Sequence, residues 1–313
     1  MDKIDAKLLY GLSVNAKTPI KQLAKGIRLS ESSAIYRIEK LKQDGILLGT
    51  TAIVNSYLLG YSGFRAYVFL MGTTKTQEDE IVSWLVKQKE ASVVATTLDF
   101  REIGIMSWVK SSASFSGFIR NLKEKYGKFI ASLQIFPYVG TIYYPRNYLV
   151  TQESASATVV RPVGSVSCDD LDLAILRELS VDCRKSCLEI SSKLKVSAKT
   201  VINRINSLER KGVIAGYTAN INVSKLGYHY YKLNIVFSNN VRYSELLSFA
   251  EKSRFVTYID ETISQYDVEL NVEVPDDAHL KALLDGLKEE FGGIRLLEIK
   301  QVDKYPKMSF LSV

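Results

Sequence analysis

The chain contains one segment twice, and this duplication limits the folds that are open to it. Aligned without a gap at an offset of 167 residues, residues 5–61 and 172–228 are identical at 18 of 57 positions. The tripeptide Leu59-Gly60-Tyr61 recurs as Leu226-Gly227-Tyr228. A period this long indicates a duplicated domain and not a solenoid, whose repeats span about 20–50 residues. Both copies must therefore adopt one fold.

Each copy contains a helix with an apolar stripe and a polar, basic face. In the second copy Ser197 suits the N-cap of this helix, Gly212 suits its end, and the extended run 213–222 that follows predicts a β-strand. Apolar residues at helical spacing are expected to be buried: Val201, Ile202, Ile205 and Leu208. The other face carries residue types that bond bases and phosphates: Lys199, Thr200, Asn203, Arg204, Ser207 and Arg210.

The first copy predicts three short helices. The first ends near Val14, and Thr18 and Pro19 suit the N-cap and first position of the second. The third, Glu31 to Asp44, is expected to bury Ile35, Ile38 and Leu41 and to expose Ser32, Ser33, Tyr36, Arg37 and Lys40. Three helices with a tight turn before the third form a tri-helical DNA-binding unit. A three-helix module without a DNA function has the same periodicity, but the strand, the basic face and the duplication favour DNA.

After Tyr61 the apolar period changes from 3.6 to 2, which predicts alternating strands and helices. The order in both halves is βαββαβ, a ferredoxin-like unit. The expected elements are 64–71, 78–89, 93–98, 103–109, 115–126 and 133–144, then 230–237, 243–252, 256–262, 266–274, 276–291 and 294–302. Such a sheet has helices on one face only, so its other face must be buried against something.

The stretch KGVIAGYTANINVSKLGY resembles the helix-to-strand signature of the Lrp/AsnC (feast/famine) transcription regulators, and DGILLGTTAIVNSYLLGY is a looser copy of it. The family pairs a winged helix-turn-helix with a βαββαβ effector and assembly domain called RAM, usually in one copy. The resemblance implies an α+β fold in which both domains occur twice, as a tandem duplication. The expected boundaries are 1–55 and 169–222 for the winged helices, 62–148 and 229–308 for the RAM-like domains, and 149–168 for an extended, weakly ordered linker.

The charge distribution fits double-stranded DNA as the partner. The chain has a formal net charge of +7. Residues 1–50 hold nine lysines and arginines against five acids, a net charge of +4, so over half of the excess lies in the first helical unit. The N-terminus MDKIDAK lacks an apolar signal core, and no apolar run is long enough to span a bilayer. We expect a cytoplasmic protein with no membrane partner and no cofactor.

In a DNA complex, Lys199, Thr200 and Asn203 are expected at base edges and Arg204 and Arg210 on phosphates. The matching positions in the first copy are Ser32, Ser33 and Tyr36 for bases, with Arg37 and Lys40 on the backbone. An ion pair within the domain, from Arg37 to Asp5 or from Arg204 to Asp172, is the alternative role of these arginines.

The two sets of predicted base-contact residues differ, so we expect an asymmetric DNA site. Our hypothesis is an internal pseudo-dimer with its two RAM-like sheets packed face to face and half-sites about one helical turn apart. The competing arrangement is a homo-oligomer, a domain-swapped or symmetric pair of chains. The sequence does not separate these two arrangements.

The family resemblance also implies a small effector, such as an amino acid, near the turn between the second and third RAM strands. That turn often reads Gly-Asp-Tyr-Asp in the family. The second copy has Ser264-Gln265-Tyr266-Asp267, so Tyr266 and Asp267 are the candidate effector residues, and the first has Asp99-Phe100-Arg101-Glu102. The missing glycine removes backbone freedom from the turn, and a solvated acid is the simpler role for Asp267.

Cysteine spacing and histidine content argue against metal or enzyme chemistry. Cys183 and Cys187 replace Ala16 and Ile20 in the internal alignment, so buried apolar cysteines are expected, and no metal site is expected because zinc would need more ligands. Siroheme decarboxylases resemble the same architecture and depend on histidine and arginine, but the two histidines here, at 229 and 279, lie in no histidine-rich motif. We expect no enzyme; the decarboxylase and a co-regulator without specific DNA binding are the alternatives.

Overall fold

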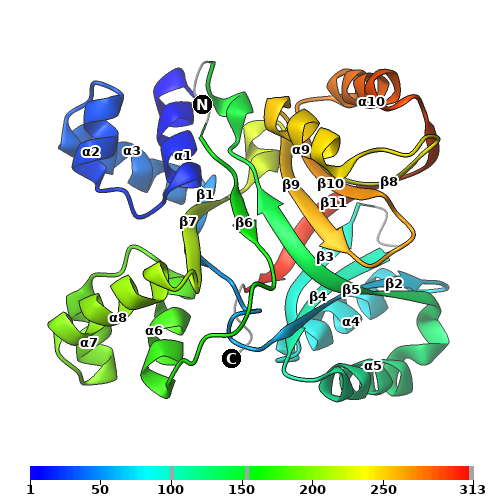
Figure 1. The fold of residues 1–313 in the computed structure, drawn as a ribbon, viewed down its shortest axis with the longest axis horizontal. Helices are drawn as coiled ribbons and strands as arrows, with labels where there is room; N and C mark the ends of the chain where they lie inside the picture. Colours follow the sequence, from blue (N-terminus) through cyan, green and yellow to red (C-terminus); the bar gives the residue numbers. More distant parts are fainter. Residues whose placement is uncertain (99–101, 152–154, 310–313) are drawn as a thin grey trace.

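This computed structural model describes residues 1–98, 102–151 and 155–309. Two helical units lie along one flank of the molecule, and a β-sheet assembly with its covering helices forms the other (Figure 1). The fold is α+β and repeats one arrangement twice: three helices and a strand, followed by βαββαβ.

The first helical unit consists of α1 (Lys3–Val14), α2 (Ile20–Gly26) and α3 (Glu31–Gln43). The Ser30 hydroxyl accepts a hydrogen bond from the Ser33 amide and so caps α3 as its N-cap. The prediction for α2 is wrong by one residue, because Pro19 is its N-cap and Thr18 lies outside the helix. Proline fits there because its missing N–H and fixed φ cost nothing at a helix start.

The second helical unit repeats this arrangement with α6 (Asp170–Val181), α7 (Cys187–Leu194) and α8 (Ala198–Arg210). The turn before the third helix uses a left-handed residue in both copies, Arg28 with φ 59° and Lys195 with φ 55°. After α8 the chain turns at Gly212, where φ is 71°, a conformation that glycine adopts without a Cβ penalty.

The third helices bury a slightly different face from the predicted one. Ile35 and Ile202 are exposed, and the buried residues are Ala34, Ile38 and Leu41 in α3 and Val201, Ile205 and Leu208 in α8. Spacings of four and three residues put the buried triplets on one helical face. The predictions that Ile35 and Ile202 are buried are therefore wrong. The neighbouring Ala34 and Val201 occupy the core position instead.

A two-stranded antiparallel ribbon joins the two helical units. Its strands are β1 (Leu47–Val54) and β7 (Ile214–Ile221), one from each copy. Each strand also contacts the other copy's first helix. Thr51 Oγ1 donates to the Ser180 carbonyl at 2.9 Å, and Thr218 Oγ1 donates to the Ser13 carbonyl at 3.0 Å. These equivalent bonds relate the two units by an approximate two-fold axis.

The two βαββαβ units have equivalent elements. The first consists of β2 (Ser62–Leu70), α4 (Lys75–Lys87), β3 (Ala91–Thr97), β4 (Glu102–Val109), α5 (Ser112–Tyr126) and β5 (Ile130–Tyr143). The second consists of β8 (His229–Phe237), α9 (Tyr243–Lys252), β9 (Val256–Thr262), β10 (Val268–Val274), α10 (Asp277–Phe291) and β11 (Ile294–Met308).

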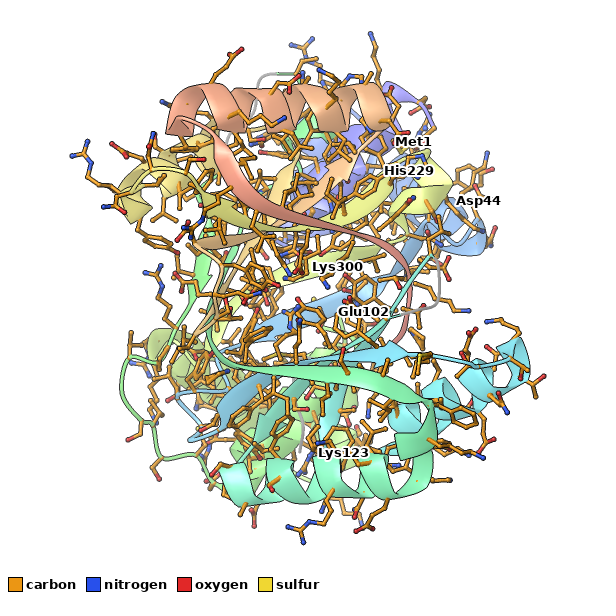
Figure 2. All side chains as sticks on the ribbon, turned by 90° about the vertical axis from the view of Figure 1, so that its right-hand side faces the viewer. Met1, Asp44, Glu102, Lys123, His229 and Lys300 are labelled. Atoms are coloured by element: carbon orange, nitrogen blue, oxygen red, sulfur yellow. The ribbon has the colours of Figure 1, made fainter. Side chains whose placement is uncertain are left out.

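The two sheets pack face to face within one chain. Helices α4 and α5 cover the outside of one sheet, α9 and α10 cover the other, and side chains fill the space between (Figures 1 and 2). The long strands close the two edges, because β5 pairs with β2 and then with β9, while β11 pairs with β8 and then with β3. Each sheet therefore buries its uncovered face against the other copy.

The described parts of the segment between the copies, up to residue 151 and from residue 155, are more ordered than predicted. Strand β6 (Thr158–Val160) pairs with the end of β5, and the Val166 amide donates to the Leu58 carbonyl at 2.7 Å. Tyr148, Leu149 and Val150 are buried against the core of the first helical unit. Strand pairing and apolar burial hold these described residues, whose composition alone suggested a loose linker.

Candidate nucleic-acid interface

The predicted DNA-contact residues gather on the outer faces of α3 and α8. In α3, Ser32, Ser33, Tyr36 and Lys40 are exposed. With Arg37, Asp2 and Asp5 they line one hollow of about 530 Å³. In α8, Lys199, Asn203 and Arg210 are exposed and Thr200 is half-buried. Neither face is covered by the described residues of the rest of the chain.

Arg37 and Arg204 make the ion pairs that the sequence left as an alternative. Arg37 lies 2.7 Å from carboxylate oxygens of both Asp2 and Asp5. Arg204 lies 2.8 Å from Asp169 and 3.2 Å from Asp172. The two clusters are equivalent in the two copies and tie the third helix to the start of the first.

Hydrogen bonds that the guanidinium groups donate to these carboxylates raise the pKa of both arginines. Both guanidinium groups are partly exposed, with 29 % and 37 % of their side chains open to solvent. A phosphate can therefore reach them, although their charge is already compensated, and their phosphate role remains a prediction.

Two basic residues also connect the helical units to one another. The sequence did not predict these contacts. Lys17 Nζ lies 3.4 Å from Glu209 and 3.0 Å from the Tyr217 hydroxyl. At the equivalent position Arg184 donates to the Ala16 carbonyl at 2.5 Å and the Thr18 carbonyl at 2.9 Å. A basic residue at the same place in both copies was the only signal in the sequence. The two outer helix faces are thus held at a fixed spacing.

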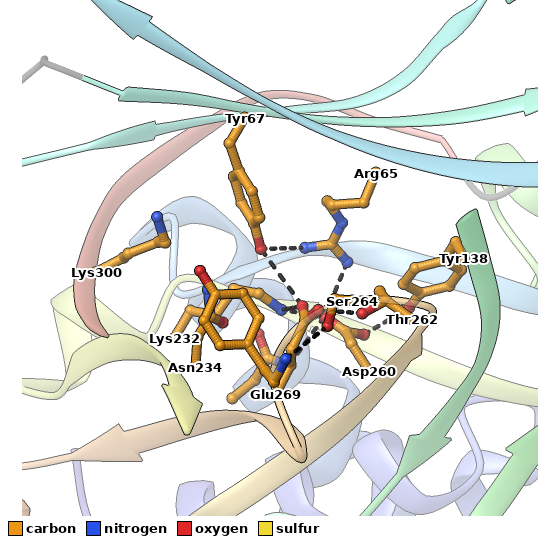
Figure 3. Close-up of polar contacts among 12 residues, drawn as sticks. Arg65, Tyr67, Tyr138, Lys232, Asn234, Asp260, Thr262, Ser264, Glu269 and Lys300 are labelled. Carbon is orange, nitrogen blue, oxygen red and sulfur yellow. Dashed lines mark hydrogen bonds and ion pairs between the residues drawn. The ribbon is translucent and has the colours of Figure 1, made fainter. Parts of the chain in front are cut away.

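The interior between the two sheets holds a buried network of charges (Figure 3). Arg65 from β2 lies 2.8 Å from Asp260 on β9. Lys232 lies 2.6 Å from Asp260 and 3.0 Å from Glu269. Burial by itself would raise the pKa of Asp260, but the two cations outweigh it and hold that pKa well below its usual range.

Two further buried ion pairs cross between the copies. Lys300 on β11 lies 2.5 Å from Glu102, and Figure 2 shows both near the middle of the two sheets. Arg146 lies 2.9 Å from Glu273, whose carboxylate also accepts a hydrogen bond from the Tyr148 hydroxyl. Each of these buried cations has a carboxylate partner, so the interior leaves them no free charge for an anionic ligand.

Tyr266 and Asp267, the predicted effector residues, line a cavity of about 490 Å³ beside β9 and β10. Three linker residues, 161–163, form another wall of it. The Asp267 carboxylate accepts a hydrogen bond from the Phe237 amide at 2.8 Å, and Arg161 pairs with Glu261. Asp267 is thus an exposed acid, and one of its oxygens bonds the backbone. The matching turn of the first copy, 99–101, lies outside the described residues.

The cysteines and histidines that the sequence analysis considered for metal or siroheme chemistry lie outside the charge network between the two sheets. Cys183 is buried and Cys187 half-buried, and both are free thiols. Among the described residues no cluster of histidine, cysteine and acid side chains could hold a metal ion. His279 is paired with Asp276 on the surface of α10, and His229 is exposed at the start of β8. Within the described ranges, no helix is both long and apolar enough to cross a membrane.

Comparison with known proteins relates both helical units to helix-turn-helix regulators. Residues 1–42 match the AsnC-type helix-turn-helix domain, and residues 169–215 match a winged helix-turn-helix DNA-binding family. The chain is 36 % identical over 100 residues to an uncharacterized HTH-type transcriptional regulator of Pyrococcus furiosus, covering 32 % of this chain and 68 % of the relative. It is 31 % identical over 119 residues to the HTH-type transcriptional regulator FL11 of Pyrococcus abyssi, covering 38 % and 78 %.

The solved structure of an enzyme resembles this chain over nearly its whole length. The crystal structure of the siroheme decarboxylase NirDL matches with a TM-score of 0.61 and 15 % sequence identity, covering 98 % of this chain and 93 % of that one. At this identity the likeness concerns the fold alone: the two-copy arrangement of helical units and paired sheets.

Proposed function

Because this chain belongs to the Lrp/AsnC family of helix-turn-helix regulators, we propose that it is a sequence-specific, DNA-binding transcription regulator with two non-identical readers. The observation that carries the proposal is the exposure of both outer helix faces. From here α3 and α8 are called the recognition helices, and the helical units that contain them the first and second reader. Phosphate contacts supply affinity, and side chains at base edges supply sequence choice.

The preferred DNA site is asymmetric. The readers share their scaffold but differ at the predicted base contacts, with Ser32, Ser33 and Tyr36 in one and Lys199, Thr200 and Asn203 in the other. The ribbon and the Lys17 and Arg184 contacts support a fixed spacing, with half-sites about one helical turn apart. Pairing of the sheets within the chain supports a pseudo-dimer as the DNA-binding unit.

Selection of bound sequences from random DNA, followed by footprinting at two salt concentrations, tests this proposal. We expect two different half-sites and binding that weakens steeply with salt, since phosphate neutralisation releases counterions. Equal protection of both halves of a perfect palindrome would contradict the asymmetric reading. Weak binding that does not depend on salt would instead support the co-regulator alternative.

A small effector acting through the Tyr266 cavity is the finer part of the proposal. The cavity volume suits a small molecule, and its linker wall leads towards the second reader. Asp267 bonds the Phe237 amide through one oxygen, which leaves its other acceptor sites for an amine. Equilibrium dialysis or calorimetry against the common amino acids tests for binding, and no heat or retention for any of them would remove this part.

Tetrapyrrole decarboxylation is the second candidate, favoured by the fold shared with the siroheme decarboxylase NirDL. The charges argue against it, because tetrapyrrole carboxylates need free cations. The buried cations between the sheets are already paired, and the Tyr266 cavity is lined by four acids. Titration with a siroheme-type pigment, followed by its absorption spectrum, separates the two functions. A saturable spectral shift would favour the enzyme.

A further inference from the structure

The two recognition helices share one exposed apolar side chain. Ile35 on α3 is 44 % exposed and Ile202 on α8 is 45 % exposed. Each lies five residues after the N-cap of its helix, Ser30 or Ser197. The N-terminal half of a recognition helix is the part that enters the major groove.

The rest of the exposed face differs between the copies. Along α3 and α8, which are described over their full lengths, every other position that is exposed in both copies holds two different residues. These pairs are Ser32/Lys199, Tyr36/Asn203, Glu39/Asn206, Lys42/Glu209 and Gln43/Arg210. Among the positions exposed in both helices, the isoleucine is therefore the one that keeps the same residue, while the shared Arg37 and Arg204 are half-buried in ion pairs.

Helix stability and core packing do not account for this isoleucine. A β-branched residue is less favourable than alanine within a helix, and the core positions are filled by Ile38 and Ile205 with Ala34 and Val201 beside them. A single exposed apolar residue is ordinary on a protein surface. Its repetition at the same place on two helices whose other exposed positions differ is not explained in that way.

We propose that Ile35 and Ile202 each contact the methyl group of a thymine at the same position of the two half-sites. This inference rests on the proposed DNA-binding function. The C5 methyl of thymine is the apolar group on the major-groove edge of the base pairs, and aliphatic side chains read it by direct contact. A lone isoleucine among polar neighbours is too small an apolar surface for a stable protein interface.

The consequence is a specific form of the DNA site. The two half-sites share a T·A pair at one equivalent position, read by the isoleucines. They differ at the neighbouring base pairs, where Tyr36 in one reader is replaced by Asn203 in the other. The approximate two-fold axis of the readers therefore relates the two T·A pairs to each other. It does not relate the flanking base pairs, which differ between the half-sites.

The test uses the full chain and a duplex of the selected sequence, in which single thymines are replaced by deoxyuridine. This replacement removes the methyl group and leaves the hydrogen-bonding groups in place. We expect one thymine in each half-site at which deoxyuridine weakens binding roughly fourfold, the effect of losing one buried methyl group. Ile202→Ala should bind the unmodified site roughly fourfold more weakly and lose the difference between T and U in one half-site only.

Ile35→Ala should show the same loss in the other half-site. Val181→Ala, which truncates an apolar residue that is 73 % exposed on α6, is the matched control and should change neither value. Equal binding of T and U sites by the unmodified chain would overturn the inference while leaving DNA binding intact. So would an Ile202→Ala variant that still distinguishes T from U in both half-sites. Absence of any salt-sensitive DNA binding would remove the proposed function and this inference together.

Discussion

Arg65 of the first copy and Asp260 of the second form an ion pair of 2.8 Å between the two sheets. The acids on the inner face of the second copy include Asp260, Glu269 and Glu273, all buried. Arg65 and Arg146 of the first copy compensate two of them. Two second-copy sheets facing each other would lack these arginines, so the charges favour pairing between unlike copies.

Arg65→Met should destabilise the protein by about 3 kcal/mol, because it leaves part of the Asp260 charge uncompensated in a buried place. The loss is at the low end for a buried pair because Lys232 remains 2.6 Å from the same carboxylate. Urea unfolding measures the change. Lys75→Met, which breaks the exposed Lys75–Asp79 pair, is the control and should cost less than about 1 kcal/mol.

Acid should destabilise the protein through Asp260. Its pKa is lowered in the folded state, so its ion pairs contribute stability that is complete above the unfolded pKa of about 3.9 and is lost as the pH falls towards the folded value. Asp260→Asn should be less stable at pH 7 and should show a flatter decline of the urea midpoint below about pH 5. Asp79→Asn, at an exposed site, should keep the original profile. A parallel decline in both variants would show that Asp260 does not drive it.

Arg204→Ala should weaken binding to all DNA sequences and reduce the salt slope by about one. The guanidinium is partly exposed beside the outer face of α8, where it can exchange a carboxylate for a phosphate. The salt dependence of the dissociation constant measures this. Lys281→Ala on α10, far from the readers (Figure 1), should leave the slope unchanged. An unchanged slope for Arg204→Ala as well would mean that the ion pair persists on DNA.

Asn203→Ala should relax sequence choice in one half-site only, by about 1–3 kcal/mol at an adenine if the amide bonds it bidentately. Asn203 is exposed on α8 and the first reader has Tyr36 in its place. Binding to a set of single-base variants of the selected site measures the change. Loss of discrimination in both half-sites would show that the assignment of readers to half-sites is wrong.

Tyr148→Ala should loosen the first reader more than the second. Tyr148 stacks on Tyr228 with ring centroids 4.4 Å apart and is buried in the cluster that includes Leu8 and Leu9 of α1. Truncation of a buried aromatic residue costs about 3–5 kcal/mol. Amide hydrogen exchange should therefore accelerate in α1 more than in α6. Equal acceleration in both helices would show that this segment does not support one reader in particular.

Local sequence signals were enough to predict the architecture and most of the exposed positions on α3 and α8. Local signals, such as the caps at Ser30 and Ser197 and the change of period after Tyr61, place each helix and strand because they act within a few residues. The internal identity of 18 positions in 57 required one fold in both copies. The same logic failed for Ile35 and Ile202, because periodicity cannot decide between two adjacent positions at the edge of a stripe.

Tertiary structure decided what depends on partners far apart in the chain. The ribbon pairs Thr50 with Ala219, and the interior brings Arg65 to Asp260 and Lys300 to Glu102. Residues separated by 165 to 200 positions meet there, and no local pattern records which acid a cation will meet. The ion pair between Arg204 and Asp172 likewise depends on the first helix lying beside the third. Burial and long-range pairing, which are properties of the whole fold, set these contacts.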